Sequence, residues 1–166
     1  MKFLVTGGRG FIGSHFVEKC LDEGHKVIDI DSMTYAGNRH LPFDSDEKYE
    51  HIEKDIGSIT HLPTCDILVN FAAECHVDNS INEPDVFAQT NIIGTQNLLN
   101  VARDQNIPFI HVSTDEVYGD IKKASETGDG PVDAALNTIK KITGKKERKA
   151  IDEVVSHNKF GTPIEI

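Results

Sequence analysis

Three glycines near the start of the chain are spaced for binding a diphosphate. Gly7, Gly10 and Gly13 form a GxxGxxG pattern between an apolar run at residues 2–6 and a stretch of helical periodicity at residues 10–23. The first glycine permits a tight turn, the second lets a diphosphate approach the backbone, and the third lets the helix pack closely on a sheet. Because a helix N-terminus offers unpaired N–H groups and a favourable dipole, the pattern predicts a phosphate-binding turn.

A carboxylate follows at the distance expected for a ribose ligand. Asp31 ends the next apolar run, residues 26–31, and stands 18 residues after Gly13. A carboxylate in this position accepts hydrogen bonds from both ribose hydroxyls and repels a 2′-phosphate, which favours NAD over NADP. Arg39 lies nearby in the sequence and is able to bind such a phosphate, so NADP stays an alternative.

Two adjacent acids follow a later apolar run, at residues 108–113. Thr114, Asp115 and Glu116 come directly after it. If the run is a strand of a parallel sheet, the triplet lies at the carboxyl edge, where ligands of such folds bind. Neighbouring carboxylates in different environments can serve as the acid and the base of one reaction. The triplet is therefore the candidate catalytic group.

Strand-like runs alternate with helical periodicity, which predicts the elements that must position these residues. Helices are expected at residues 10–23, 84–105 and 147–158, and a final strand at 162–166. The alternation predicts a single α/β domain over residues 1–166, a doubly wound parallel sheet of Rossmann type in three layers. Apolar and β-branched runs predict its five main strands at residues 2–6, 26–31, 50–54, 66–71 and 108–113.

The composition of the chain is that of one soluble domain. Its 166 residues are 38% hydrophobic and 27% charged, with a net charge of −10 that disfavours binding to nucleic acid. The three cysteines lack metal-ligand spacing, and no stretch approaches the ~20 apolar residues of a membrane span. We therefore expect a reduced cytoplasmic protein that holds no metal and contacts neither membrane nor nucleic acid.

Four segments of residues 1–120 share an order and spacing that is specific in combination. They are TGGRGFIGS at 6–14, DSMTYAGN at 31–38, FAAECHVDNSI at 71–81 and STDEVYGD at 113–120. In these segments the chain resembles the extended short-chain dehydrogenase/reductase family of NAD-dependent nucleotide-sugar epimerases and dehydratases, and most of all its dTDP-glucose 4,6-dehydratase type. Residues 121–146 diverge from that pattern.

The resemblance implies NAD as coenzyme, a nucleotide-diphosphate sugar as substrate, and a homodimer formed through helix 84–105 and a helix within 144–157. Thr114 would hold the sugar O4, Asp115 would be the acid and Glu116 the base for eliminating water across C5–C6. Cys75 stands at a substrate-facing position where the family has serine. The coenzyme contacts implied are Gly7, Gly10, Phe11, Ile12, Gly13, Asp31, Ser32, Met33, Thr34, Asp55, Ile56, Phe71, Ala72, Ala73 and Thr90.

One residue of the family pattern has no counterpart in this sequence. In the family, a tyrosine removes the proton of the sugar O4 while hydride passes from C4 to NAD⁺, and a lysine four residues later on the same helix face lowers the pKa of that tyrosine. The chain has only Tyr35, Tyr49 and Tyr118. Tyr118 and Lys122 have the right spacing, but they directly follow the fifth predicted strand, and we interpret the match as coincidence.

Two main interpretations follow from the sequence. One is the NAD-binding half of a nucleotide-sugar 4,6-dehydratase. The other is a non-catalytic NAD-binding module that keeps the fold, as a pseudoenzyme, a truncated product or an engineered chimera. An epimerase or reductase is a third, disfavoured by the acid pair Asp115–Glu116. The sugar-nucleotide-binding half that follows in the family is not expected within these residues, so little activity is expected of this chain alone.

Overall fold

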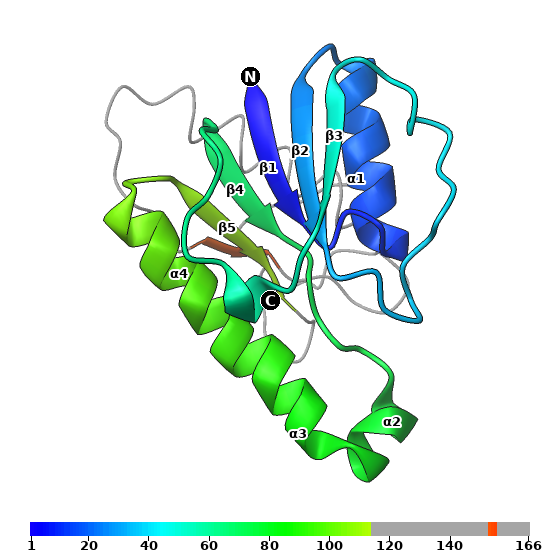
Figure 1. The fold of residues 1–166 in the computed structure, drawn as a ribbon, viewed down its shortest axis with the longest axis vertical. Coiled ribbons are helices and arrows are strands. Elements are labelled where there is room, and N and C mark those ends of the chain that lie inside the picture. Colours follow the sequence, from blue (N-terminus) through cyan, green and yellow to red (C-terminus); the bar gives the residue numbers. More distant parts are fainter. Residues whose placement is uncertain (114–152, 156–166) are drawn as a thin grey trace, which may run out of the picture.

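The computed structural model describes residues 1–113 and 153–155. Their strands form one parallel sheet in the order β3-β2-β1-β4-β5-β6 (Figure 1). This order reverses direction between β1 and β4, as in doubly wound folds. The strands are β1 Lys2–Thr6, β2 Lys26–Asp31, β3 Tyr49–Glu53, β4 Ile67–Asn70, β5 Phe109–Val112 and β6 Glu153–Val155.

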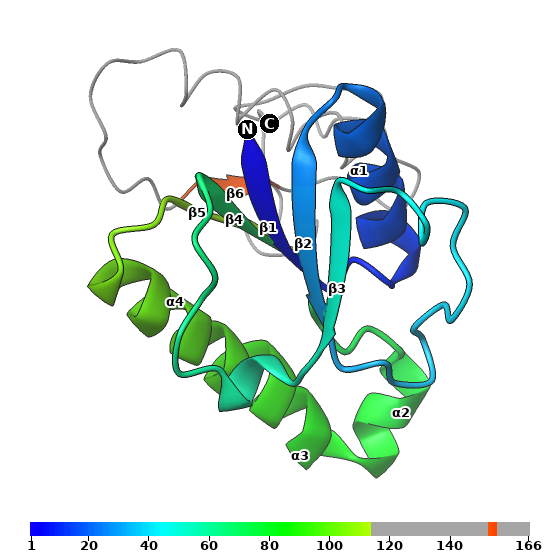
Figure 2. The same ribbon diagram turned by 45° about the horizontal axis from the view of Figure 1, so that its top comes forward.

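Helices cover both faces of the sheet, which confirms the three-layer Rossmann-type fold (Figures 1 and 2). One face is covered by α1 and the other by α4, which is the last part of a continuous helical rod made of α3, the π-helical segment η2 and α4 (Figure 2). The helical elements are α1 Phe11–Asp22, the 3₁₀ turn η1 Ile56–Ser58, α2 Val77–Asn82, α3 Pro84–Phe87, η2 Ala88–Gly94 and α4 Thr95–Asp104.

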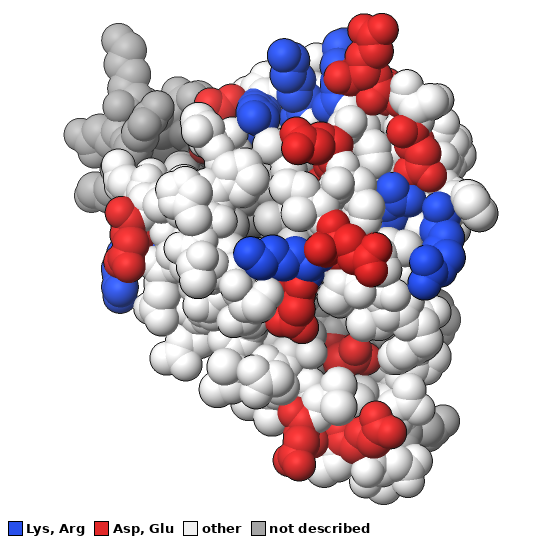
Figure 3. Space-filling model, in the orientation of Figure 1, with Lys and Arg blue, Asp and Glu red and all other residues white. Residues whose placement is uncertain are grey.

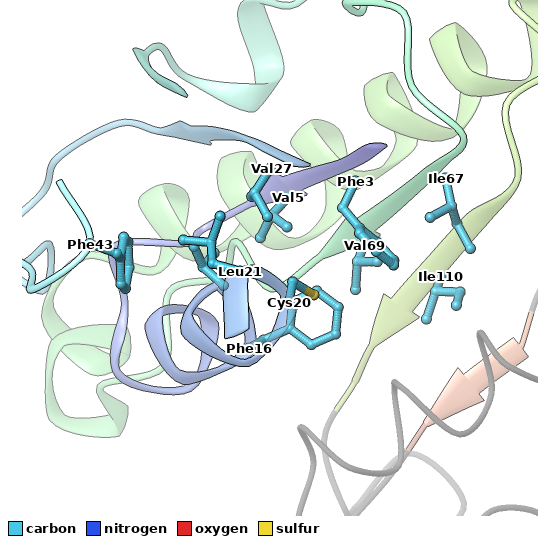
Figure 4. Packing of buried hydrophobic residues seen from close by; sticks show 11 residues of the cluster. Phe3, Val5, Phe16, Cys20, Leu21, Val27, Phe43, Ile67, Val69 and Ile110 are labelled. Atoms are coloured by element: carbon cyan, nitrogen blue, oxygen red, sulfur yellow. The ribbon is translucent and has the colours of Figure 1, made fainter. Parts of the chain in front are cut away.

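Alternate residues of β1 pack into two hydrophobic cores, one on each face of the sheet. Phe3 and Val5 pack with Phe16 and Cys20 of α1 in one cluster (Figure 4). Leu4, between them, packs on the opposite face in the cluster that contains Leu98 of α4. Because side chains of a strand alternate between faces, the apolar run at residues 2–6 is the signature of a strand buried on both sides.

Sequence patterns located most described elements to within a residue or two. The predicted helix at residues 84–105 is correct, although seven of its residues take π-helical geometry. The predicted helix at 147–158 is wrong for residues 153–155, which form β6 beside β5. Val154 and Val155 are β-branched and favour a strand, and β5 offers an open edge with which they pair. The strand expected at 162–166 lies outside the described residues.

Candidate coenzyme-binding site

The carboxyl ends of β1, β2 and β4 bring three predicted coenzyme segments to one edge of the sheet. The glycine turn follows β1, Asp31 ends β2, and Phe71 to Ala73 follow β4. The strand order reverses between β1 and β4, and in open α/β sheets ligands bind in the crevice at such a reversal.

Close packing of backbones explains the glycines of the turn. Gly7 has a φ of 75°, and a Cβ atom added there would lie 2.5 Å from the backbone N of Ala72. A Cβ on Gly13 would overlap the carbonyl oxygen of Gly7. The first and third glycines therefore pack β1, β4 and α1 together, and Gly10 meets only a looser contact, 3.3 Å from that same oxygen.

The N-terminus of α1 is open for an anion. Gly10 caps the helix without any side-chain hydrogen bond to its first turn. The N–H groups of Gly8 and Arg9 donate instead to the carboxylates of Asp29 and Asp31 in β2, at 2.9 and 3.0 Å. The N–H groups of the first helical turn lack intrahelical acceptors, and Phe11, the first helical residue, is 83% exposed. The arrangement fits a diphosphate bound to the backbone of Phe11 and Ile12.

Asp31 is a buried carboxylate held from two sides. Its Oδ1 accepts from the N–H of Met33 at 2.8 Å and its Oδ2 from the N–H of Arg9 at 3.0 Å. Burial raises the pKa of Asp31, although the two backbone hydrogen bonds act in the opposite direction. Met33 has a φ of 53°, which turns the chain sharply after β2 and leaves Ser32 and Thr34 exposed beside Asp31.

Several predicted coenzyme residues turn their side chains toward the protein. Asp55 caps η1 by accepting from the N–H of Gly57 at 2.6 Å. Ile56 is buried and packs closely against Gly94 of η2. The ring of Phe71 lies 5.1 Å from that of Phe16 in the α1 core.

A buried polar residue that the sequence reasoning missed joins three strands at this edge. The Oδ1 of Asn70, the last residue of β4, accepts from Thr6 Oγ1 at 2.5 Å and from the N–H of Ala72 at 3.1 Å. Its Nδ2 lies 3.0 Å from His111 Nδ1 in β5. The sequence does contain a signal for this role. Asn70 ends an apolar run, and a polar side chain buried at the end of a strand needs hydrogen-bond partners.

The segment after β4 is tied to its surroundings on two sides. The Asn91 side chain, in η2, forms two hydrogen bonds with the backbone of Glu74. The carboxylate of Glu74 accepts from the hydroxyl of Tyr35, which follows β2, at 2.9 Å. Thr90 is the neighbour of Asn91 and is half-buried, while Cys75 is exposed. The residues after β2 and after β4 are thereby linked above the sheet edge.

Neither described tyrosine has the environment of a general base. The hydrogen bond to Glu74 raises the pKa of Tyr35. Burial, together with the nearby negative charge of Asp29, raises the pKa of Tyr49, whose hydroxyl donates to Asp29 at 3.0 Å. A base for a sugar hydroxyl needs a lowered pKa. Tyr118 and the candidate catalytic residues Thr114, Asp115 and Glu116 lie outside the described residues.

The described residues, 1–113 and 153–155, contain neither a candidate metal site nor a candidate membrane-spanning helix. Within them, no group of His, Cys, Asp and Glu side chains is arranged to hold a metal ion. None of the helices in these ranges is long and apolar enough to cross a membrane.

The sheet order and the glycine turn define a Rossmann-type domain, and comparison with known proteins places it more narrowly. The family model described as GDP-mannose 4,6 dehydratase matches residues 4–135, so the chain belongs to this family. It is 43% identical over 146 residues to dTDP-glucose 4,6-dehydratase of Xanthomonas campestris, covering 76% of this chain and 40% of the relative. It is 41% identical over 145 residues to the low-salt glycan biosynthesis protein Agl12 of Haloferax volcanii, covering 80% of this chain and 45% of the relative.

Solved structures agree with this placement. The dTDP-glucose 4,6-dehydratase DesIV of Streptomyces venezuelae, crystallised with NAD and TYD, superposes with a TM-score of 0.67 at 45% identity, covering 78% of this chain and 43% of that one. UDP-glucose 4-epimerase of Thermotoga maritima, with UDP-glucose, gives a TM-score of 0.63 at 33% identity, covering 76% and 42%. The resemblance to nucleotide-sugar 4,6-dehydratases is confirmed. The chain spans less than half the length of these relatives.

Proposed function

We propose that this chain is the NAD-binding part of a nucleotide-sugar 4,6-dehydratase. The observation that carries the proposal is the pairing of an uncapped helix N-terminus after the glycine turn with the buried carboxylate of Asp31 at the next strand end. The first suits a diphosphate and the second suits the hydroxyls of an adenosine ribose. The relatives crystallised with NAD support this choice of coenzyme.

Within that site, the roles of individual residues follow the sequence predictions. Phe11 and Ile12 receive the diphosphate, and residues 31–34 surround the adenosine ribose. Asp55 and Ile56 lie at the adenine end, where their side chains cap and pack η1 and leave the backbone to contact the base. Ala72, Ala73 and Thr90 line the nicotinamide side.

The substrate we propose is a nucleotide-diphosphate sugar, as the names of the relatives indicate. In the full reaction Asp115 and Glu116 supply the acid and the base for loss of water from C5–C6, and Thr114 holds O4. Cys75, exposed after β4, faces the sugar with a thiol that donates a weaker hydrogen bond than serine.

The second candidate is a non-catalytic NAD-binding module, which the environments of the two tyrosines in the described residues favour. C4 must be oxidised before water is eliminated, and that step needs a base on O4. Tyr35 and Tyr49 both have raised pKa values and fixed partners. An epimerase needs the same base. The observation therefore distinguishes a catalytic from a non-catalytic protein, but it does not distinguish a dehydratase from an epimerase.

We further propose a cytoplasmic homodimer that uses the rod α3–η2–α4. Its exposed side includes Val86, Ile92, Ile93 and Leu99. Figure 3 shows few charged side chains on the surface over α4. An apolar strip of this kind on a helix suits pairing with a second copy. Static light scattering at high micromolar concentration tests it, and a monomer there would refute this pairing.

The increase of NADH fluorescence on binding tests the proposed function directly. The 166-residue chain should give a saturable increase that NAD reverses by competition. Addition of free adenosine diphosphate ribose should compete as well, because it carries the diphosphate and the ribose that the site is built to hold. No saturable signal at millimolar NADH would reject the proposal.

A further inference from the structure

Arg9 is the one residue of the glycine turn with a long side chain that has no role among the proposed coenzyme contacts. It lies between Gly8 and Gly10, yet it is only 6% exposed. Its guanidinium lies against Asp29, Asp44 and Asn38 and is shielded from solvent. A buried charge is costly unless it is paired, so its partners define what it does.

Those partners belong to the adenosine loop, which we define as residues 32–48 between β2 and β3. The Nη2 of Arg9 pairs with Asp44 Oδ1 at 2.7 Å. Its Nη1 donates to the carbonyl oxygen of Asn38 at 3.3 Å, and its own carbonyl oxygen accepts from the N–H of Asn38 at 2.9 Å. One residue of the glycine turn thus holds the adenosine loop at two separate positions.

The same side chain also lies against β2 and β3. The Nε of Arg9 is 3.8 Å from Asp29 Oδ2, and the guanidinium carbon is 5.5 Å from the ring centroid of Tyr49. Asp29 is fully buried and also accepts from Gly8 and Tyr49. Arg9 therefore compensates a buried carboxylate that itself orients the glycine turn.

The backbone of Arg9 connects this cluster to the ribose carboxylate, because its N–H donates to Asp31. A loop of this length, containing glycine, asparagine and proline, loses much conformational entropy when it is ordered. Because Arg9 already holds the loop, less conformational entropy remains to be lost when the coenzyme binds.

We propose that Arg9 is a positioning residue for the coenzyme: it clamps the adenosine loop onto the glycine turn so that Asp31, Met33 and Thr34 are preorganised around the adenosine ribose. Its guanidinium is committed to Asp44, Asn38 and Asp29 and is thereby withheld from a 2′-phosphate. The inference rests on the proposed function for its ligand, and on the contacts above for the clamp.

The test compares Arg9→Met and Arg9→Lys with Arg103→Met, whose arginine is exposed on α4 and pairs only with its neighbour Asp104 among the described residues. Affinities for NAD and for adenosine diphosphate ribose are measured by calorimetry. Amide hydrogen exchange is measured without coenzyme. Asp44→Asn, at a partly exposed position, serves as a milder variant if Arg9→Met folds poorly.

Arg9→Met should lower the affinities for NAD and for adenosine diphosphate ribose by the same factor, on the order of tenfold. It should also speed amide exchange at residues 33–44, while the amides of β1 and β4 stay protected. Arg9→Lys should recover part of the affinity, because lysine can pair with Asp44 but cannot also donate in the same geometry to Asn38. Arg103→Met should change neither quantity.

Unchanged affinity in both Arg9→Met and Asp44→Asn would overturn the positioning role, even if exchange became faster. Unchanged exchange at residues 33–44 would overturn the clamp itself. Failure of the wild-type chain to bind NAD would reject the proposed function, while the exchange experiment, which needs no coenzyme, would still decide the clamp.

Discussion

The side-chain amide of Asn91 spans the backbone of Glu74. The N–H of Glu74 donates to Asn91 Oδ1 at 2.8 Å, and Asn91 Nδ2 donates to the carbonyl oxygen of Glu74 at 2.9 Å. Asn91 belongs to the π-helical segment η2, and Glu74 to the segment that follows β4. The pair therefore ties the segment after β4, the nicotinamide side of the proposed coenzyme site, to a π-helical turn of a kind that often occurs at functional sites.

Replacing Asn91 with alanine should loosen residues 71–76 and weaken NAD binding severalfold. Two hydrogen bonds to backbone groups are lost, each contributing about 0.5–1.5 kcal/mol. Calorimetry with NAD measures the affinity, and urea unfolding measures the free energy of unfolding. Asn100→Ala, at an exposed site on the same rod, is the matched control and should change little. Equal behaviour of the two variants would show that the Asn91–Glu74 pair has no role in binding.

Gly7→Ala should be much more destabilising than Gly24→Ala. Both glycines have positive φ values, 75° and 84°, so alanine is strained by about 1–2 kcal/mol at either site. A Cβ at Gly24 meets nothing closer than the flexible end of Lys48 at 3.9 Å, whereas at Gly7 it lies 2.5 Å from the backbone of Ala72. Forcing β1 and β4 apart should add about 1–3 kcal/mol.

Urea unfolding of the two glycine variants measures this difference. Equal losses in the free energy of unfolding would mean that the turn relaxes without disturbing Ala72. In that case the close approach of the two backbones is not what requires glycine at position 7.

The stability of the domain should fall as the pH falls below the ordinary pKa of histidine, partly through His111. Burial lowers the pKa of His111 from 6.5. Below pH 6.5 the unfolded chain therefore binds a proton that the folded chain resists, and stability is lost until the pH reaches the lowered folded value. The contribution is at most about 1.4 kcal/mol per pH unit.

The measurement is the free energy of unfolding at about pH 7.5 and about pH 5.5. His111→Gln should lose less stability between these values than the wild type, because glutamine does not titrate. His15→Gln, on the exposed side of α1, is the control for replacing a histidine with glutamine. A His111→Gln variant as pH-sensitive as the wild type would exclude this residue as a cause.

The fold was largely predictable because apolar periodicity is a local property. The run at residues 26–31 and the helical spacing at 10–23 predicted β2 and α1 with errors of at most one residue at either end. The short α2 and the 3₁₀ turn η1 were missed, since each contains too few residues to show a period. The segment at 153–155 was assigned to a helix because its pairing with β5 is a long-range property that spacing does not report.

The positions of the motif residues in the candidate site could be predicted from the sequence, but its contacts between residues distant in the sequence could not. Gly7 and Gly13 lie at the junction of β1 and α1 and Asp31 ends β2, as the spacing predicted, while their coenzyme roles stay predictions. The involvement of Asn70 and Arg9 arises from hydrogen bonds and ion pairs to residues far along the chain, such as His111 and Asp44. Such pairings become visible only when the strands and the adenosine loop are assembled.

The 166-residue chain alone should convert dTDP-glucose to its 4-keto-6-deoxy product at a trace rate or not at all. The chain has no tyrosine in the region after residue 118, where the family places its base, and general-base catalysis is typically worth ~10²–10⁴-fold. Mass spectrometry of the product measures turnover. Robust turnover would contradict this expectation, and loss of that turnover in Tyr118→Phe would identify Tyr118 as the base.

Calorimetric titration of the wild type and of Asp31→Ala with NAD and with NADP tests the central claim most directly. The wild type should bind NAD and bind NADP much more weakly, because the Asp31 carboxylate accepts ribose hydroxyls and repels a 2′-phosphate. Asp31→Ala should lose NAD affinity on the order of tenfold or more and lose the discrimination between the two coenzymes. Wild-type protein that binds NADP as tightly as NAD, or an Asp31→Ala variant with unchanged NAD affinity, would contradict the account.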